Sequence, residues 1–324
     1  AAAVASPGSW AAPGSVLLVS CYELGRQPFN IASPWAQLEA AGFGVSGVDT
    51  SVQPLGDVVS AKLVAISVPM LTATRLGMAL AERIRELAPA AHICFFGLYA
   101  SLNAELLLSR WGDSVIGGEF EVALVELALA LAADGVKAGP VDGVLRRGDR
   151  LAAAMALPVL RKLPFVVPKR DGLAPLERYA TFWGPTEGEI RTVGYVEASR
   201  GCRHTCLHCP VTPVYRGRFF VVPSDVVLAD AEQQIAAGAR HITFGDPDFF
   251  NGPKHAMRIA RALHEAHPDV SFDATIKVEH VLQWPQLVSD LATLGCAFII
   301  SAIESLSDVV LRELDKGHTR ADVF

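Results

Sequence analysis

Short apolar runs alternate with longer stretches of mixed polarity over the first part of the chain. The apolar runs predict strands at residues 16–19, 45–48, 63–68, 92–96 and 114–116. Between two of them, Leu76, Leu80, Ile84 and Leu87 recur at helical spacing and predict a helix over 72–87. Near-continuous apolar strands joined by helices are typical of a parallel sheet covered on both faces. We therefore predict a doubly wound α/β domain over residues 16–135.

The same alternation resumes after residue 193. Strands are expected at residues 193–198, 241–244, 271–276 and 297–303, with helices at 254–266 and 286–294. Ser224 and Ser307 are expected to cap two further helices, and Gly238 to close the first of these. Polar residues gather where the strands end, as in (β/α) barrels. The pattern thus predicts a flavodoxin-like doubly wound sheet followed by part of a (β/α) barrel over residues 191–324.

Two segments lack this alternation. Residues 1–15 are rich in alanine, proline and glycine and have no basic start of the kind that signal peptides carry, so we expect a disordered leader. Residues 136–190 contain basic pairs and several prolines, which predict a loop-rich linker between the two domains.

Composition excludes several classes of function. The net charge of -6 leaves no broad basic face for nucleic acid. No apolar run reaches the roughly 18 residues that span a bilayer, so no membrane partner is expected. Three of the six cysteines, Cys21, Cys94 and Cys296, lie inside apolar strand-like runs and are expected to be buried thiols in a reducing cytoplasm.

The other three cysteines form the strongest chemical motif. Cys202, Cys206 and Cys209 stand at C-x3-C-x2-C spacing directly after an expected strand. Three thiolates can hold three irons of a four-iron cluster and leave one iron open, whereas a closed cluster takes four cysteines. The residues alone leave two alternatives, a zinc site completed by His204 or His208 and a chance group of buried thiols.

This loop resembles the cluster loop of the radical S-adenosylmethionine (SAM) enzymes, with His208 where the family often has Tyr or Phe. Gly245-Asp246-Pro247 resembles the family's G-G-E-type motif, and Ser301–Ser305 resembles its segment that contacts the SAM ribose and carboxylate. Lys316-Gly317-His318-Thr319 resembles a stretch of the cobalamin-type members. The family's barrel continues beyond the units found here, so the resemblance implies a barrel that is incomplete at its C-terminus, with an exposed apolar edge.

The resemblance implies a [4Fe–4S] cluster on Cys202, Cys206 and Cys209. In the family, SAM chelates the open iron and is reductively cleaved to a 5'-deoxyadenosyl radical. A small reductant protein of the flavodoxin or ferredoxin type would supply the electron. Lys277, like Glu279, points by strand parity toward the barrel mouth. The implied SAM contacts are Gly245, Asp246, Pro247, Lys277, Ser301, Glu304 and Ser305.

Two neighbours of these residues are expected to act differently. Asp248 is expected to cap the next helix or to face the substrate, and His280 to be structural. Four arginines flank the cysteine loop and could bind an anionic substrate or electron donor, although most are expected to be solvated. They are Arg200, Arg203, Arg216 and Arg218.

The N-terminal domain resembles the cobalamin-binding domain that precedes many radical SAM cores. Ser67, Gly97, Gly117 and Gly118 lie at expected strand ends and are the implied cobalamin contacts. No D-x-H-x-x-G is present, so cobalamin would bind without an axial histidine, or the domain would bind nothing. The absence of G-x-G-x-x-G after the first strand argues against a dinucleotide.

The expected function is cobalamin-assisted methylation or rearrangement of a substrate. A radical SAM enzyme without cobalamin and a non-enzymatic iron–sulfur or zinc protein stay open as alternatives.

Overall fold

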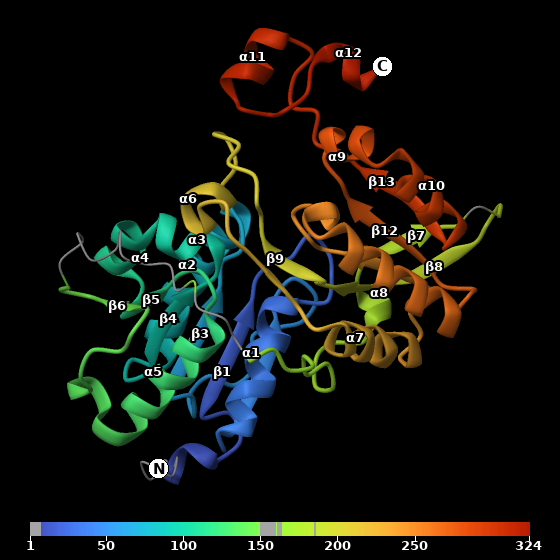
Figure 1. Cartoon of the computed structure of the whole chain (residues 1–324). Coiled ribbons are helices and arrows are strands. Elements are labelled where there is room, and N and C mark those ends of the chain that lie inside the picture. Colours follow the sequence, from blue (N-terminus) through green and yellow to red (C-terminus); the bar gives the residue numbers. More distant parts are fainter. Residues whose placement is uncertain (1–7, 150–159, 161–163, 185) are drawn as a thin grey trace. The chain divides into compact units, whose positions relative to one another are not determined.

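The computed structural model describes residues 8–149, 160, 164–184 and 186–324 (Figure 1). It divides into two compact units, Ala1–Ala174 and Pro175–Phe324. The expected linker, residues 136–190, begins inside the first unit and ends inside the second. We describe each unit by itself.

The first unit is built on a six-stranded sheet in the order β2-β1-β3-β4-β5-β6. Its strands are β1 (Val16–Ser20), β2 (Val45–Asp49), β3 (Leu63–Ser67), β4 (His92–Phe96), β5 (Ser114–Ile116) and β6 (Val144–Arg146). Strands β1 to β5 are parallel, and β6 pairs antiparallel with β5. This is the flavodoxin-like order, in which the chain changes direction between β1 and β3. The doubly wound sheet is therefore confirmed.

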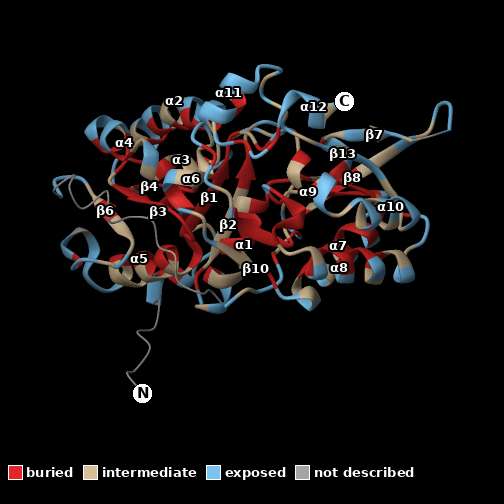
Figure 2. Ribbon diagram, turned by 45° about the horizontal axis from the view of Figure 1, so that its top comes forward, coloured by how far each residue is buried: buried red, intermediate tan, exposed pale blue. Residues whose placement is uncertain are grey.

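Helices cover both faces of this sheet. They are α1 (Phe29–Ala40), α2 (Leu71–Leu87), α3 (Leu98–Leu102), α4 (Ala104–Arg110) and α5 (Glu121–Asp134). Strand β4 has apolar side chains on both faces of the sheet, since Phe95 packs in the apolar cluster of one face and Phe96 in that of the other. Both faces therefore need a layer of helices. Figure 2 shows buried residues along the central strands and exposed ones on the outer helix surfaces.

Helix α2 forms where expected, and of the four apolar residues expected on it Ile84 is buried and Leu80 packs against the core, but the other two are exposed. Leu76 and Leu87 are 47% and 46% exposed. The buried stripe consists of Ala73, Thr74, Gly77, Ala81 and Ile84. A Cβ on Gly77 would lie 3.1 Å from Ile66 Cγ2, so small residues let the helix lie close to the sheet.

The second unit holds a five-stranded sheet in the order β13-β12-β11-β8-β7. Its strands are β7 (Thr181–Trp183), β8 (Ile190–Val196), β11 (His241–Phe244), β12 (Ser271–Thr275) and β13 (Cys296–Ile300). The last four are parallel, and β7 runs antiparallel along β8. Strands β9 (Ser199–Gly201) and β10 (Phe219–Val221) form a separate hairpin.

Short and long helices connect these strands into a partial (β/α) barrel. They are α6 (Val211–Tyr215), α7 (Ser224–Ala236), α8 (Pro253–Ala266), α9 (Val278–Gln283), α10 (Pro285–Thr293), α11 (Asp308–Glu313) and α12 (Arg320–Val323). Ser307 caps α11 as expected, because its side chain accepts from Val310 N. Ser224 does not cap α7; it is the first helical residue, and its Oγ accepts from Arg258 Nε instead. Strand β13 exposes Phe298 and Ile300, the apolar edge that was expected.

The leader and linker are more ordered than expected where the structure describes them. Residues Gly8–Ala11 form the 3-10 helix η1, and Trp10 is buried with its ring centroid 6.1 Å from that of Phe43. In the linker, β6 joins the first sheet and β7 joins the second. Residues 1–7 of the leader and 150–159, 161–163 and 185 of the linker lie outside the described residues. None of the described helices is long and apolar enough to span a bilayer.

Candidate functional site

A cavity lies where the four parallel strands of the second unit end. The segments that follow β8, β11, β12 and β13 all contribute to it, because parallel strands bring their carboxyl ends to one edge. Its lining residues are Cys202, His204, Cys206, His208, Cys209, Thr212, Pro247, Thr275, Ile276, Lys277, Ala302, Glu304 and Lys316. The cavity measures about 130 Å³, against the roughly 15 Å³ that one water needs, so it has room for a larger group.

All three thiols of the cysteine motif face this cavity. Cys202 and Cys206 are 9% and 7% exposed, and Cys209 is half-buried. None of the six cysteines forms a disulfide. Burial raises the pKa of the Cys202 thiol, so the protein alone does not create a thiolate there. A bound metal would supply the charge that deprotonates it.

The spacing of the thiols favours a cluster over a single ion. A lone zinc holds its sulfurs at about 2.3 Å, which brings them close to one another. Among the described residues, the group of three side chains close enough to share one ion is His204, Asp248 and His280, and the three thiols are not such a group. The residues present therefore fit a larger iron–sulfur unit better than mononuclear zinc.

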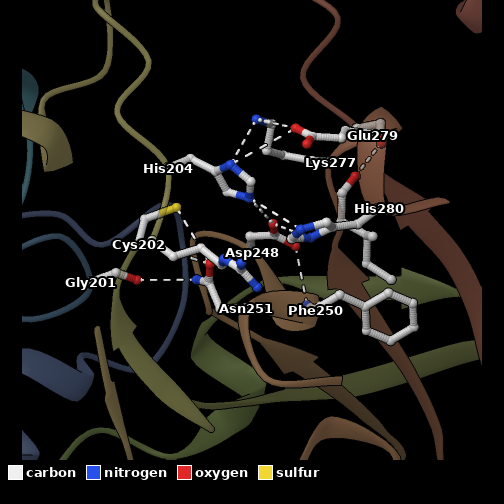
Figure 3. A network of polar contacts seen from close by, with 12 residues as sticks. Gly201, Cys202, His204, Asp248, Phe250, Asn251, Lys277, Glu279 and His280 are labelled. Carbon is white, nitrogen blue, oxygen red and sulfur yellow. Dashed lines mark hydrogen bonds and ion pairs between the residues drawn. The ribbon is translucent and has the colours of Figure 1, made fainter. Parts of the chain in front are cut away.

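Asn251, in the 3-10 helix η5 (Phe249–Asn251), holds the first cysteine in place (Figure 3). Its Oδ1 accepts from Arg203 N at 3.2 Å and lies 3.7 Å from Cys202 Sγ, while its Nδ2 donates to Gly201 O at 3.4 Å. Gly201 has a φ of +75°, and a Cβ there would come within 2.4 Å of Tyr215 Cδ1. Only glycine can occupy this position without displacing its neighbours.

Asp246 is turned away from the cavity. It is 2% exposed, its Oδ2 accepts from Ala198 N at 3.0 Å, and its Oδ1 accepts from Ser199 Oγ at 2.5 Å. Burial raises its pKa to about 6. The carboxylate thus holds the segment that leads into the cysteine loop. The expected contact between Asp246 and the SAM ammonium stays a prediction, and Asp246 is not among the residues that line the cavity.

The neighbouring Gly245 has a packing role of its own. Its N donates to Val196 O at 2.8 Å, which extends the pairing of β11 with β8. A Cβ on Gly245 would lie 1.9 Å from Tyr195 Oη, so any other residue there would require the Tyr195 ring to move. Pro247, the last residue of this motif, does line the cavity.

Glu304 is the carboxylate that faces the thiols. Its Oε1 lies 3.2 Å from His208 Nε2 and 3.5 Å from Lys316 Nζ, and Lys316 is almost fully buried. The backbone of Glu304 has a φ of +69°, a left-handed conformation that costs free energy in a residue other than glycine. Such strain is typical of functional positions. Lys316 is the residue of the Lys316–Thr319 stretch that lines the cavity.

Lys277 lies in the cavity wall as expected. Its Nζ donates to His204 Nδ1 and to Glu279 Oε2, both at 3.1 Å (Figure 3). The two expected serines do not line the cavity. Ser301 Oγ donates to Ile276 O and so joins the ends of β13 and β12, and Ser305 Oγ accepts from Ser307 N at 3.0 Å.

The sequence did not reveal the convergence of His204, Asp248 and His280. Asp248 caps η5 as expected, since its Oδ1 accepts from Phe250 N at 3.1 Å. It also faces both histidines. Burial would raise the pKa of Asp248, but the contacts with His204 and His280 outweigh it and lower the pKa to about 2. The available signal was that each residue lies in the segment after one of three adjacent parallel strands, β8, β11 or β12.

In the first unit, the expected cobalamin residues also meet at one edge. Ser67 ends β3 in register with Phe96, and Phe96 is in register with Ile116, so Gly97 and Gly117 follow at the same level. Gly118 comes next and has a φ of +73°. A Cβ on Gly117 would lie 2.4 Å from Ser101 Cβ, which shows how tightly this edge is packed.

Three buried hydroxyls at this edge lack partners. Among the described residues, Ser20, Ser67 and Ser101 have side-chain oxygens with no hydrogen-bond partner. Ser20 ends β1 beside Ser67, at the point where the strand order reverses and where such sheets bind ligands. Unsatisfied buried hydroxyls are costly, so a polar ligand at this edge fits them. The one histidine of residues 1–174, His92, begins β4 at the opposite edge and cannot be an axial ligand there.

Comparison with known proteins gives a sequence match for the second unit and a shared fold for most of the chain. Residues 196–324 match the sequence model of the radical SAM superfamily. No curated protein matches the chain. Two structures of TsrM, a radical S-adenosylmethionine methyltransferase from Kitasatospora setae, share the fold, each with a TM-score of 0.70.

The first of these TsrM structures has cobalamin and a [4Fe–4S] cluster bound. It is 19% identical, over 95% of this chain and 65% of TsrM. The second has tryptophan substrate and the SAM analogue aza-SAM bound and is 18% identical, over 95% of this chain and 64% of TsrM. The chain therefore spans less than two thirds of the length of TsrM.

Proposed function

We propose that the protein is a cobalamin-dependent radical SAM methyltransferase, because residues 196–324 match the sequence model of the radical SAM superfamily. One observation carries the proposal: three thiols, a carboxylate and two ammonium groups line a single cavity at the carboxyl end of a parallel sheet. The fold shared with TsrM supports methyl transfer over rearrangement.

Cys202, Cys206 and Cys209 would hold the [4Fe–4S] cluster. When bound, the cluster supplies the electron for reductive cleavage of SAM. The three thiols reach the cavity from one loop, which leaves one iron for a ligand from outside the protein.

Glu304 and Lys277 are the residues best placed to bind the amino acid part of SAM. A carboxylate and an ammonium group on the cavity wall complement the ammonium and carboxylate of the ligand. Lys316 and His208 would orient Glu304, and Glu279 would orient Lys277. We assign the ammonium contact to Glu304 rather than Asp246, because Asp246 is buried against Ala198 and Ser199.

Cobalamin would bind at the carboxyl edge of the first sheet, where it supplies a carrier for the methyl group. Ser67 and Ser20 would donate to its polar side groups, and Gly97, Gly117 and Gly118 would allow the backbone to approach it. No histidine of this unit would ligate the cobalt from below.

A small reductant protein would deliver the electron. Arg203, Arg216 and Arg218 are exposed around the cysteine loop, and Leu207 beside them is 72% exposed. Exposed cationic and apolar side chains suit an acidic partner of the flavodoxin or ferredoxin type.

Anaerobic reconstitution with iron and sulfide tests this function. We expect about four irons per chain, a visible cluster band, and changes in the electron-spin spectrum when SAM is added. Cys209→Ala should abolish the band, whereas Cys296→Ala, an equally half-buried cysteine outside the loop, should keep it. Stoichiometric zinc without iron would reject the enzyme function in favour of a zinc protein.

The cobalamin part has a separate readout. The reconstituted protein should retain a red chromophore after incubation with hydroxocobalamin and gel filtration. It should also transfer the labelled methyl group of SAM to the corrinoid. A protein that forms its cluster and binds SAM but retains no corrinoid would instead be a radical SAM enzyme without cobalamin.

A further inference from the structure

Three side chains from three segments meet beside the cysteine loop (Figure 3). His204 lies within the loop, Asp248 follows β11, and His280 lies in α9. One nitrogen of each histidine and one oxygen of Asp248 lie within 4.8 Å of one another. Asp248 Oδ2 is 2.7 Å from His280 Nδ1 and 3.4 Å from His204 Nε2.

These separations suit the coordination of one ion. Nitrogen and oxygen ligands stand about 2.0–2.2 Å from a zinc ion, which puts neighbouring ligand atoms roughly 3 Å apart. Two imidazoles and a carboxylate are also the donors that first-row divalent metals prefer.

Hydrogen bonds within the protein satisfy this group only in part: His204 Nε2 lies 3.2 Å from His280 Nε2, and Asp248 Oδ1 accepts from Phe250 N, but two buried atoms are left over. Asp248 is 0% exposed and His280 2% exposed. Among the described residues, Asp248 Oδ2 and His280 Nδ1 form an ion pair at 2.7 Å but have no hydrogen-bond partner. Buried charged groups are normally paired or bound to a metal.

The charges around the group favour a cation. Lys277 pairs with Glu279 at 3.1 Å, so these two neutralise one another. The carboxylate of Asp248 then faces the imidazoles of His204 and His280. A divalent ion would balance it and would also align the two histidines.

We propose that His204, Asp248 and His280 bind a divalent transition-metal ion, separate from the iron of the cysteine loop. Zn²⁺ and Fe²⁺ are the ions that this donor set fits best. Three protein ligands leave coordination positions for water or for a nitrogen or oxygen of a substrate. Since His204 and Lys277 line the cavity, those positions would be next to it.

Zinc retention by the anaerobically reconstituted protein tests the site. Protein with full iron occupancy is incubated with one equivalent of Zn²⁺ and desalted. The iron and zinc contents per chain are then measured on the same sample. We expect about one zinc per chain in addition to the iron, and an X-ray absorption spectrum at the zinc edge with nitrogen and oxygen ligands only. Sulfur ligands, or no retained zinc, would overturn the proposal.

Matched variants identify the ligands. Asp248→Asn and His280→Gln should lose the zinc and keep the cluster band. Glu279→Gln, whose carboxylate lies 3.9 Å from His204 Nδ1 but outside the trio, should retain the zinc. Retention in both ligand variants would place the ion elsewhere and overturn the assignment.

A variant without the cysteine loop thiols makes the test independent of the proposed function. Cys202→Ser/Cys206→Ser/Cys209→Ser cannot form a cluster, and no loop thiolate competes for zinc. It should still bind about one zinc through nitrogen and oxygen. If the parent forms no cluster but the triple serine variant binds zinc, the enzyme function is rejected and the proposed metal site is retained. Absence of zinc here, in protein with the parent's circular dichroism spectrum, would reject the metal site.

Discussion

Asp246 and Asp248 stand two residues apart in one turn, yet their carboxylates face different parts of the site. Asp246 points to the segment before the cysteines and accepts from Ala198 and Ser199. Asp248 points to His204 and His280. The hydrophobic pattern shows both only as polar residues after a strand. It does not reveal the direction in which each carboxylate points.

Asp246→Ala should lower stability and cluster loading together. It removes two buried hydrogen bonds to a carboxylate, and each such bond contributes about 1.5–3 kcal/mol. We expect a lower melting temperature and less iron after reconstitution. A variant with full iron and the parent's melting temperature, but weaker SAM binding, would restore Asp246 as a SAM contact.

Glu304→Gln should weaken SAM binding and leave the cluster in place. A charge-assisted contact of about 1.5–3 kcal/mol corresponds to roughly one to two decades in affinity. Titration of the electron-spin spectrum with SAM measures this at constant iron content. Glu313→Gln is the control, since Glu313 is exposed on α11 and does not line the cavity, and an equal loss there would contradict the assignment.

Glu23 makes the stability of the first unit depend on pH. Burial raises the pKa of Glu23 from 4.5 to about 7, so between these values the folded protein binds more protons than the unfolded chain. Stability should therefore fall as pH rises from about 4.5 to about 7, by at most about 3 kcal/mol. Denaturant unfolding of Glu23→Gln should lack this decline, and a decline of equal size in the variant would assign it to other groups.

At the scale of elements, small residues decide how closely a helix can pack. Ala73, Gly77 and Ala81 lie on the buried side of α2, while Leu76 and Leu87 are exposed. A count of apolar positions gives leucine more weight than alanine or glycine, and that is why the sequence placed these two leucines on the buried side.

Gly77→Leu should therefore destabilise the first unit by about 1–3 kcal/mol through overpacking. Leu76→Ala, on the exposed side of the same helix, should change the free energy of unfolding by less than about 0.5 kcal/mol. Denaturant unfolding compares the two. A larger loss in Leu76→Ala would mean that the leucine face is the one that packs.

The central strands and the cysteine motif could be predicted because their signals are local. Continuous apolar runs specify strands such as β3 and β4, and C-x3-C-x2-C lies within one loop. Strands β6 and β7 were missed because each is three residues long and depends on a partner strand. The meeting of Asp248 with His280 could not be predicted, since it depends on which strands become neighbours.

On the scale of the whole molecule, two parallel sheets each carry a candidate site at their carboxyl edge. Each sheet has its own layers of helices, and an antiparallel strand, β6 or β7, ends one side of it. The two sites use residues from separate units, so a substitution at one should leave the cofactor of the other unaffected.

Ser67→Ala should reduce corrinoid retention and leave iron content unchanged. Its hydroxyl is buried without a partner among the described residues, so the loss of the hydroxyl should not lower the melting temperature. Loss of one hydrogen bond to the ligand, about 1 kcal/mol, corresponds to a severalfold weaker affinity by equilibrium dialysis. An unchanged affinity would remove Ser67 from the corrinoid site.

The anchoring of the cysteine loop has a consequence for repair. Asn251 holds Gly201 and Arg203, and Leu207 N donates to Leu314 O at 3.0 Å, so the loop is ordered by contacts that need no iron. A loop that is already ordered does not lose further conformational entropy when its cofactor enters. Protein that has lost its cluster to oxygen should then regain it when iron, sulfide and a thiol reductant are supplied, without first being unfolded.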